Sequence, residues 1–273
     1  MASTRIADAF ARAKAENRLA FMPYMVPGHP SLEESAGVLD AVIEGGADII
    51  EVGIPFSDPL ADGTTIQRVA FEALENGMTP HGCMDFAREA RQRHPETALI
   101  FMTYLNPVLA YGVEAFAADA AAAGIDGAIL TDMPPEEGSR IQPVFQAAGL
   151  DLIYLVAPTS SDHRLQVIAE HAGGFIYCVS VTGVTGARSE IAADLPAFLA
   201  RVRRCTALPL AVGFGISRRE HIEALAGLAE GAVVGSALMS LVSETGPADR
   251  HRAVREYVET LTGRRRPNGV TTA

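Results

Sequence analysis

The sequence has 273 residues, of which 48% are apolar, and it carries a formal net charge of −11. This excess of acids argues against a nucleic-acid-binding protein, which needs a basic face, and no apolar run reaches the roughly 18 residues that span a membrane. The three cysteines, Cys83, Cys178 and Cys205, are far apart and form no C-x-x-C pair, which argues against a disulfide scaffold and predicts a cytoplasmic protein.

Helical and extended segments alternate along the chain. A leading amphipathic helix is predicted at about residues 4–17, and eight short apolar segments that suit buried strands follow it. The predicted strands are residues 19–25, 48–52, 98–103, 125–130, 152–155, 175–179, 210–213 and 232–234. Helices are predicted from Ser31, after Gly63, from Thr79-Pro80, at about 113–123, from Pro134-Pro135, after Ser161, from about Ser189, from Ser217, and at about 246–262.

Three of these helices have recognisable start signals. Ser31-Leu-Glu-Glu34 and Ser217-Arg-Arg-Glu220 match the capping box, in which a serine side chain accepts a bond from the first turn. Thr79-Pro80 combines a capping threonine with a proline at the first helical position. In the helix from Ser31, we expect Leu32, Ala36, Leu39 and Ile43 to share the buried face.

Strict alternation of strands and helices requires parallel pairing through right-handed crossovers. Eight such units predict a single-domain (β/α)8 TIM barrel with an additional N-terminal helix, and a doubly wound open sheet is the alternative. We expect one domain over residues 1–273, with an ordered core at about 5–262 and a flexible tail at 263–273.

The stretch from Glu51 to Gly63 joins a strand end to a loop rich in proline and glycine. Glu51 ends the second strand, and Asp58 and Asp62 follow in the loop. Parallel barrels build their sites at such strand ends, so this stretch is the predicted catalytic loop. The alternatives are a structural carboxylate for Glu51 and turn-forming roles for the two aspartates.

Glycines stand at three consecutive strand exits, Gly183-Val-Thr-Gly186, Gly213-Phe-Gly215 and Gly235-Ser236. In barrels a phosphate group often lies between the last loops, on backbone N–H groups that glycine leaves accessible. We therefore predict a phosphate site here; the alternative is three ordinary turns. The histidines have no H-x-x-x-H spacing, so no metal site is predicted, and no G-x-G-x-x-G follows the first strand, which argues against a dinucleotide.

These motifs together resemble one family. E-V-G-I-P-F-S-D-P-L-A-D-G at 51–63, G-V-T-G at 183–186, G-F-G-I-S at 213–217 and G-S-A at 235–237 are similar to the tryptophan synthase alpha chain family, over roughly residues 5–262. The resemblance implies a lyase that cleaves indole-3-glycerol phosphate to indole and glyceraldehyde 3-phosphate. It also implies an α2β2 complex with a β chain that holds pyridoxal phosphate, and no cofactor in this chain.

The resemblance assigns roles residue by residue. It makes Glu51 the catalytic acid and base, and Asp62 the partner of the indole N–H. The remaining residues would be Tyr177, Phe214, Tyr104, Met102 and Thr131 around the substrate, Gly186, Gly215, Gly235 and Ser236 around the phosphate, and Asp58, Pro59, Asn106 and Pro107 at the β-chain interface.

The chain departs from the family pattern at Thr64, at Val181-Thr182 and at Thr131. Among its apolar sequence neighbours Ile50, Val52, Ile54 and Phe56, Glu51 should have a raised pKa. We expect loops 53–63 and 180–190 to close over the substrate. Two other functions stay open: another phosphosugar barrel, such as an isomerase or epimerase, and a non-catalytic chain that activates its β partner.

Overall fold

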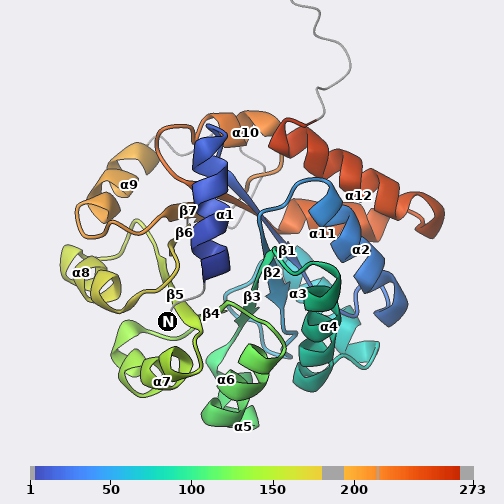
Figure 1. The fold of residues 1–273 in the computed structure, drawn as a ribbon, viewed down its shortest axis with the longest axis horizontal. Coiled ribbons are helices and arrows are strands. Elements are labelled where there is room, and N and C mark those ends of the chain that lie inside the picture. The colour runs from blue at the N-terminus through green and yellow to red at the C-terminus, as the bar shows by residue number, and fades with distance from the viewer. Residues whose placement is uncertain (1–3, 180–193, 214, 265–273) are drawn as a thin grey trace, which may run out of the picture.

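Eight parallel strands close into a barrel in the computed structural model, which describes residues 4–179, 194–213 and 215–264 (Figure 1). Each strand pairs with the next along the chain, and β8 pairs with β1. The strands are β1 (Ala20–Met25), β2 (Ile49–Gly53), β3 (Ala98–Thr103), β4 (Gly127–Leu130), β5 (Asp151–Val156), β6 (Ile176–Val179), β7 (Leu210–Gly213) and β8 (Gly231–Val234). The predicted (β/α)8 barrel is confirmed, because an open sheet would leave β1 and β8 unpaired.

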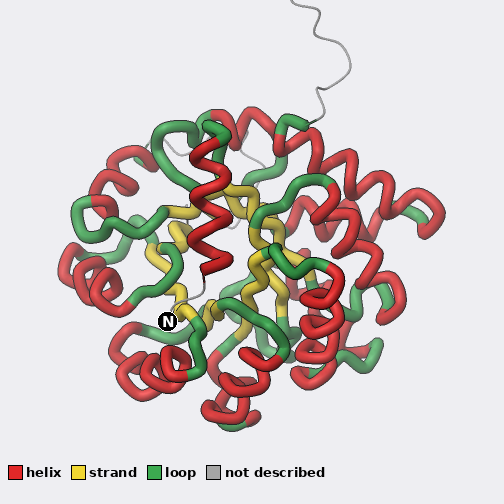
Figure 2. Tube along the Cα trace, in the orientation of Figure 1, coloured by secondary structure: helices red, strands yellow, loops and turns green. Residues whose placement is uncertain are grey.

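Helices form a ring around the strands (Figure 2). They are α1 (Thr4–Ala15), α2 (Leu32–Glu44), α3 (Thr64–Glu75), α4 (Pro80–Arg93), α5 (Leu105–Tyr111), α6 (Val113–Ala122), α7 (Pro135–Ala147), α8 (Asp162–His171), α9 (Leu195–Arg203), α10 (Arg219–Glu223), α11 (Ser236–Glu244) and α12 (Pro247–Thr262). The two helices predicted between β2 and β3, after Gly63 and from Thr79-Pro80, are α3 and α4. Two short helices, α5 and α11, were not predicted. None of the helices in these described ranges is both long enough and apolar enough to cross a membrane.

The leading helix α1 lies across the N-terminal end of the barrel (Figure 1). Its apolar residues Ile6, Ala9 and Phe10 belong to the same buried cluster as Met22 and Ile100 of the strands. The rings of Phe10 and Phe175 lie 5.7 Å apart between centroids. The amphipathic pattern of α1 therefore closes this end of the barrel, and the opposite end is left for the loops that follow the strands.

Successive side chains of a strand point to opposite sides, and this alternation separates two cores. Ile49 belongs to the cluster inside the barrel, whereas Ile50 and Val52 belong to the cluster between strands and helices. Glu51 and Gly53 share the inward side of β2 with Ile49. In the register of the sheet, Tyr24 of β1 and Ile100 of β3 lie beside Glu51.

Of the three predicted helix start signals, two are confirmed and one is wrong. Ser31 accepts a hydrogen bond from the backbone N–H of Glu34, and Thr79 accepts one from Gly82, so both predicted caps are confirmed. The capping box at Ser217 is wrong. The chain passes through a left-handed turn at Gly215 (φ 75°) and reaches helical geometry only at Arg219, so Arg218 stands at the cap position without a side-chain bond.

One further expectation about helices needs correction. Of the four residues predicted to face inward in α2, Leu39 is buried, Ala36 and Ile43 are partly buried, and Leu32 is exposed. The buried residues of this helix are Ser35, Val38, Leu39, Ala41 and Val42. The helix carries two overlapping apolar stripes, and the one that contains Val38, Leu39 and Val42 packs against the barrel. Helix α9 begins at Leu195, after a turn at Asp194; the start predicted at about Ser189 lies outside the described residues.

Candidate active site

The catalytic carboxyl predicted at the end of β2 is fully buried. Glu51 is 0% exposed, and neither carboxyl oxygen has a hydrogen-bond partner within the described residues. Burial raises the pKa of Glu51 to about 8. The direction agrees with the sequence-based expectation, but its cause is different. Ile50 and Val52 face the helices, and the inward residues of neighbouring strands are the ones that exclude water.

Two tyrosines flank Glu51 inside the barrel. Tyr24 comes from β1 and Tyr177 from β6, and both are buried. Burial, and then the charges of the nearby carboxylates Glu51 and Asp62, raise the pKa of Tyr177. A Cβ built on Gly213 would lie 2.3 Å from the Tyr177 hydroxyl, so this ring packs directly on the glycine of β7.

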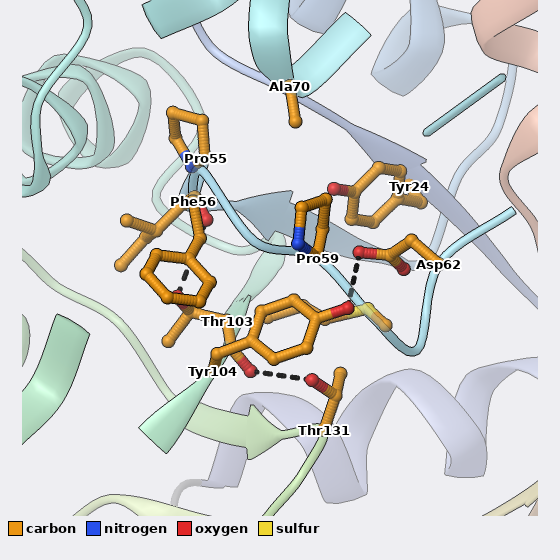
Figure 3. Close-up of a pocket in the computed structure, with 11 residues that line it drawn as sticks. Tyr24, Pro55, Phe56, Pro59, Asp62, Ala70, Thr103, Tyr104 and Thr131 are labelled. Carbon is orange, nitrogen blue, oxygen red and sulfur yellow. Dashed lines mark hydrogen bonds between the residues drawn. The ribbon is translucent and has the colours of Figure 1, made fainter. Parts of the chain in front are cut away.

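The second predicted acid, Asp62, is held by a tyrosine from the neighbouring strand exit (Figure 3). The Tyr104 hydroxyl donates to Oδ2 of Asp62 at 2.9 Å and accepts from the backbone N–H of Ala61 at 2.9 Å. Burial raises the pKa of the Asp62 carboxyl, and the bond from Tyr104 opposes that rise. The two contacts fix the loop end and orient the carboxylate.

A pocket lies between this loop and the exits of β3 and β4 (Figure 3). Of the residues assigned from the sequence, Asp62, Pro59, Met102, Tyr104 and Thr131 line it. The other residues of its lining were not predicted: Tyr24, Ile54, Pro55, Phe56, Ala70 and Thr103. Tyr24 could have been found from the inward alternation of β1.

The departure at Thr131 has a structural consequence. Thr131 donates from its hydroxyl to the carbonyl oxygen of Thr103 at 3.2 Å. Its polar group is thus bonded to the backbone of β3. Asp132, the next residue, accepts from the backbone N–H of Leu105 at 2.7 Å and stabilises the start of α5.

Two of the three predicted glycine exits can be placed, and they follow the adjacent strands β7 and β8. Gly215 follows β7 with a positive φ of 75° and is exposed. Gly235 stands at the cap of α11 without a side-chain bond, and the exposed Ser236 begins that helix. Gly186 and Phe214 lie outside the described residues, as do Val181 and Thr182.

The predicted interface residues lie on two neighbouring segments. Asp58 and Asn106 are exposed, and Pro59 and Pro107 are partly buried. The rings of Phe56 and Tyr104, with centroids 5.4 Å apart, connect the two segments.

Metal ligation was not expected from the sequence. In the part of the chain that the structure describes, no three His, Cys, Asp or Glu side chains gather in an arrangement that could hold a metal ion.

Comparisons with known proteins agree with this geometry. The sequence profile described as "Tryptophan synthase alpha chain" matches residues 10–265. The tryptophan synthase alpha chain of Roseiflexus castenholzii is 47% identical over 260 residues, which are 95% of this chain and 100% of that protein.

Solved structures show the same relationship. A tryptophan synthase structure from Mycobacterium tuberculosis superposes with a TM-score of 0.87 at 38% identity, over 96% of this chain and 98% of that one. The tryptophan synthase subunit alpha from Legionella pneumophila gives 0.85 at 35% identity, over 95% and 97%. The chain therefore belongs to the tryptophan synthase alpha chain family, the lyase subunits of tryptophan biosynthesis, as the motifs predicted.

Proposed function

We propose that this chain cleaves indole-3-glycerol phosphate to indole and glyceraldehyde 3-phosphate, with Glu51 as acid and base. The observation that carries this proposal is the state of Glu51. A carboxyl inside a barrel that has no hydrogen-bond partner among the described residues, and whose pKa is raised to about 8, holds its proton at neutral pH. A proton donor is what the first step of this reaction needs.

The reaction is a retro-aldol cleavage. Glu51 gives its proton to C3 of the indole ring, which leaves a positive charge on the ring system. The Glu51 carboxylate then takes the proton of the side-chain hydroxyl, the hydroxyl carbon becomes an aldehyde, and the electrons of the broken C–C bond return to the ring. Glu51 ends the cycle protonated, as it began.

Asp62 would stabilise the charge that develops at the ring nitrogen. A carboxylate that accepts the indole N–H forms a bond that strengthens as positive charge builds. Tyr104 occupies Oδ2 of Asp62, which leaves Oδ1 for the substrate. The side chains of Met102 and Thr131 in the same pocket would contact the ring.

The phosphate group would bind at the exits of β6, β7 and β8, on Gly186, Gly215, Gly235 and Ser236. The first N–H groups of α11 support this assignment, because no side chain of its cap residue occupies them and a helix N-terminus attracts anions. With the phosphate fixed there, the indole end of the substrate reaches the pocket beside Asp62. Loops 53–63 and 180–190 would then close over it.

A β chain that carries pyridoxal phosphate would bind at Asp58, Pro59, Asn106 and Pro107, in an α2β2 complex. Two large apolar side chains in these segments support the interface, since Leu60 is 92% exposed and Leu109 is 55% exposed. We further propose that the chain is one domain, works in the cytoplasm and needs no cofactor of its own.

Indole release tests the proposed function. The purified chain is incubated with indole-3-glycerol phosphate, with and without a tryptophan synthase β chain, and indole is measured. We expect slow release by the chain alone and faster release with the β chain. Conversion of the substrate without indole would indicate an isomerase or epimerase instead. A chain that stimulates the β chain but releases no indole in either condition would have only an activating role.

A further inference from the structure

Tyr24 lies between the two carboxylates and has no role in the mechanism above. Its position on β1 is beside Glu51 in the register of the sheet, and it lines the same pocket as Asp62. Figure 3 shows its hydroxyl directed into the pocket, toward the loop that carries Pro59. This phenol is therefore placed near both reacting ends of the site.

The hydroxyl of Tyr24 packs against a glycine of β2, which sets its position along that strand. A Cβ built on Gly53 would lie 2.2 Å from this oxygen, so the ring tip packs directly on β2. Gly53 shares the inward side of β2 with Glu51, because two positions along a strand restore the same side. The phenol thus stands just above the Glu51 side chain, on the side where the substrate enters.

Glu51 lacks a hydrogen-bond partner in the described part of the chain, since neither of its oxygens accepts a bond there. The Tyr24 hydroxyl forms no hydrogen bond to the other pocket residues drawn in Figure 3. A protonated carboxyl tolerates the lack of a partner, but an ionised one inside a barrel needs a donor. In the proposed reaction Glu51 becomes ionised for part of each cycle, directly after it protonates the ring.

We propose that the Tyr24 hydroxyl is a positioning group that donates a hydrogen bond to Glu51 while this carboxylate is ionised. A rotation of the Glu51 side chain toward the phenol forms the bond. Tyr24 keeps its own proton throughout, so the proton count of the reaction is unchanged. This inference rests on the proposed function, since it assigns a role within the same site.

The electrostatic surroundings of the phenol agree with this role. Burial raises the pKa of Tyr24, and the charges of Asp62 and Glu51 raise it further. A phenol in such surroundings stays protonated and serves as a donor only.

Tyr24→Phe tests the inference, because it removes the hydroxyl and keeps the ring that packs on Gly53. We expect kcat for indole release to fall about tenfold, as for a lost charge-assisted hydrogen bond, and KM to change less than twofold. Without the donor, ionised Glu51 is less stable and its pKa rises. The alkaline limb of the kcat/KM profile should therefore move to higher pH in the variant, and a purely structural role would not move it.

Tyr154→Phe is the matched control. Tyr154 is also buried, on β5, and its hydroxyl has no partner within the described residues. It packs on Gly138 of α7, away from the pocket, so its loss should leave both kcat and the alkaline limb unchanged. The position of the limb depends only on folded enzyme, and it stays readable even if Tyr24→Phe lowers the folded fraction.

The possible outcomes distinguish a failure of the role proposed for Tyr24 from a failure of the proposed function. If the wild-type chain releases indole, Glu51→Gln does not, and Tyr24→Phe matches the wild type in kcat and in pH profile, the role of Tyr24 is overturned and the proposed function stands. If the wild-type chain releases no indole with or without a β chain, the proposed function itself has failed.

Discussion

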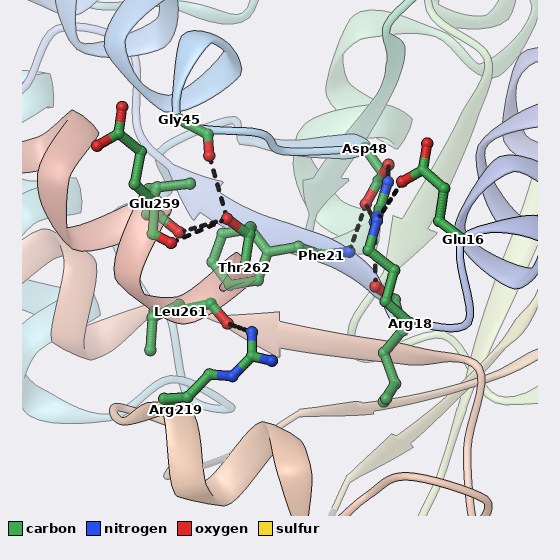
Figure 4. A network of polar contacts seen from close by, with 11 residues as sticks. Glu16, Arg18, Phe21, Gly45, Asp48, Arg219, Glu259, Leu261 and Thr262 are labelled. Carbon is green, nitrogen blue, oxygen red and sulfur yellow. Dashed lines mark hydrogen bonds and ion pairs between the residues drawn. The ribbon is translucent and has the colours of Figure 1, made fainter. Parts of the chain in front are cut away.

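Two buried acids on the same stretch of chain, Asp48 and Glu51, have opposite surroundings. Asp48 precedes β2 at the closed end of the barrel, where Arg18 donates to both of its oxygens at 2.5 and 2.9 Å and the backbone N–H of Phe21 adds a third bond at 2.8 Å (Figure 4). Glu51 lies inside the strand, toward the open end, and its oxygens have no partner among the described residues.

The difference shows how one strand can carry a structural acid and a chemical one. Burying an ionised carboxylate is costly unless charge and hydrogen bonds compensate it. Asp48 has that compensation and joins β1 to β2. The described residues offer Glu51 no such compensation, which keeps the proton on the carboxyl and makes it available to a substrate. Activity should therefore depend on Glu51 and stability on Asp48.

The largest expected effect is on catalysis at Glu51. Glu51→Gln keeps the shape of the side chain but has no proton to donate, and indole release should fall about a thousandfold, within the range of general acid–base contributions. Its unfolding midpoint at pH 6 should not fall below that of the wild type, because unfolding lets the wild-type Glu51 ionise at that pH and glutamine cannot do so. An indole assay and thermal unfolding of the same preparations check both points, and a tenth of wild-type turnover in the variant would contradict the assignment.

The opposite pattern is expected at Asp48. Asp48→Ala leaves Arg18 and the Phe21 N–H without their acceptor, and should lower the free energy of unfolding by about 2–4 kcal/mol. Indole release per folded molecule should persist. Asp48→Asn, which retains one acceptor, should lose less. Asp85→Ala is the exposed control, since Asp85 pairs with Arg88 on the surface of α4, and its effect on urea unfolding should stay below about 1 kcal/mol.

A smaller effect is expected at Asp62. Its carboxylate accepts a hydrogen bond from Tyr104, so in hydrogen bonding it is intermediate between Asp48 and Glu51. Tyr104→Phe removes the single hydrogen bond that the tyrosine donates to this carboxylate, and kcat/KM should fall about tenfold. Because that bond lowers the pKa of Asp62, its loss raises the pKa, and the acidic limb of the pH profile should move to higher pH. Tyr111→Phe removes a similar bond to exposed Asp119 and should change neither value; an unmoved acidic limb in Tyr104→Phe would leave Tyr104 as a packing residue only.

Much of the fold could be predicted because strands and helices have local signals. Apolar runs located all eight strands, and Ser31 and Thr79 marked two helix starts. The signals failed where neighbours outside the segment decide the outcome. The start of α5 is stabilised by Asp132 from another loop, and the left-handed turn at Gly215 delays the helix that Ser217 was expected to cap.

The candidate site, like the fold, could be predicted only in part. The motif with Glu51 and Asp62 indicated both acids, and the structure places Asp62 in a pocket with Met102, Tyr104 and Thr131. The sequence did not indicate which residues desolvate Glu51, because they come from other strands. The motifs did not indicate Tyr24 either, although its place on the inward side of β1 could have been predicted from the alternation along the strand.

The raised pKa of Glu51 should also make the free energy of unfolding depend on pH. A folded pKa of about 8, above the unfolded value of 4.5, means that the folded state holds this proton more tightly. The stability that this provides is fully present below pH 4.5 and is lost as the pH rises through 8. Glu51→Gln should not show this loss, so the difference in unfolding free energy between the two proteins should change across that range.

The most direct measurement is the titration of the Glu51 carboxyl itself. The chain is labelled with carbon-13 at the glutamate carboxyl groups, and the Glu51 resonance is assigned by its absence from Glu51→Gln. We expect a titration midpoint of about 8 for Glu51. A midpoint near 4.5, the ordinary value for glutamate, would mean that Glu51 is ionised at neutral pH and cannot be the proton donor.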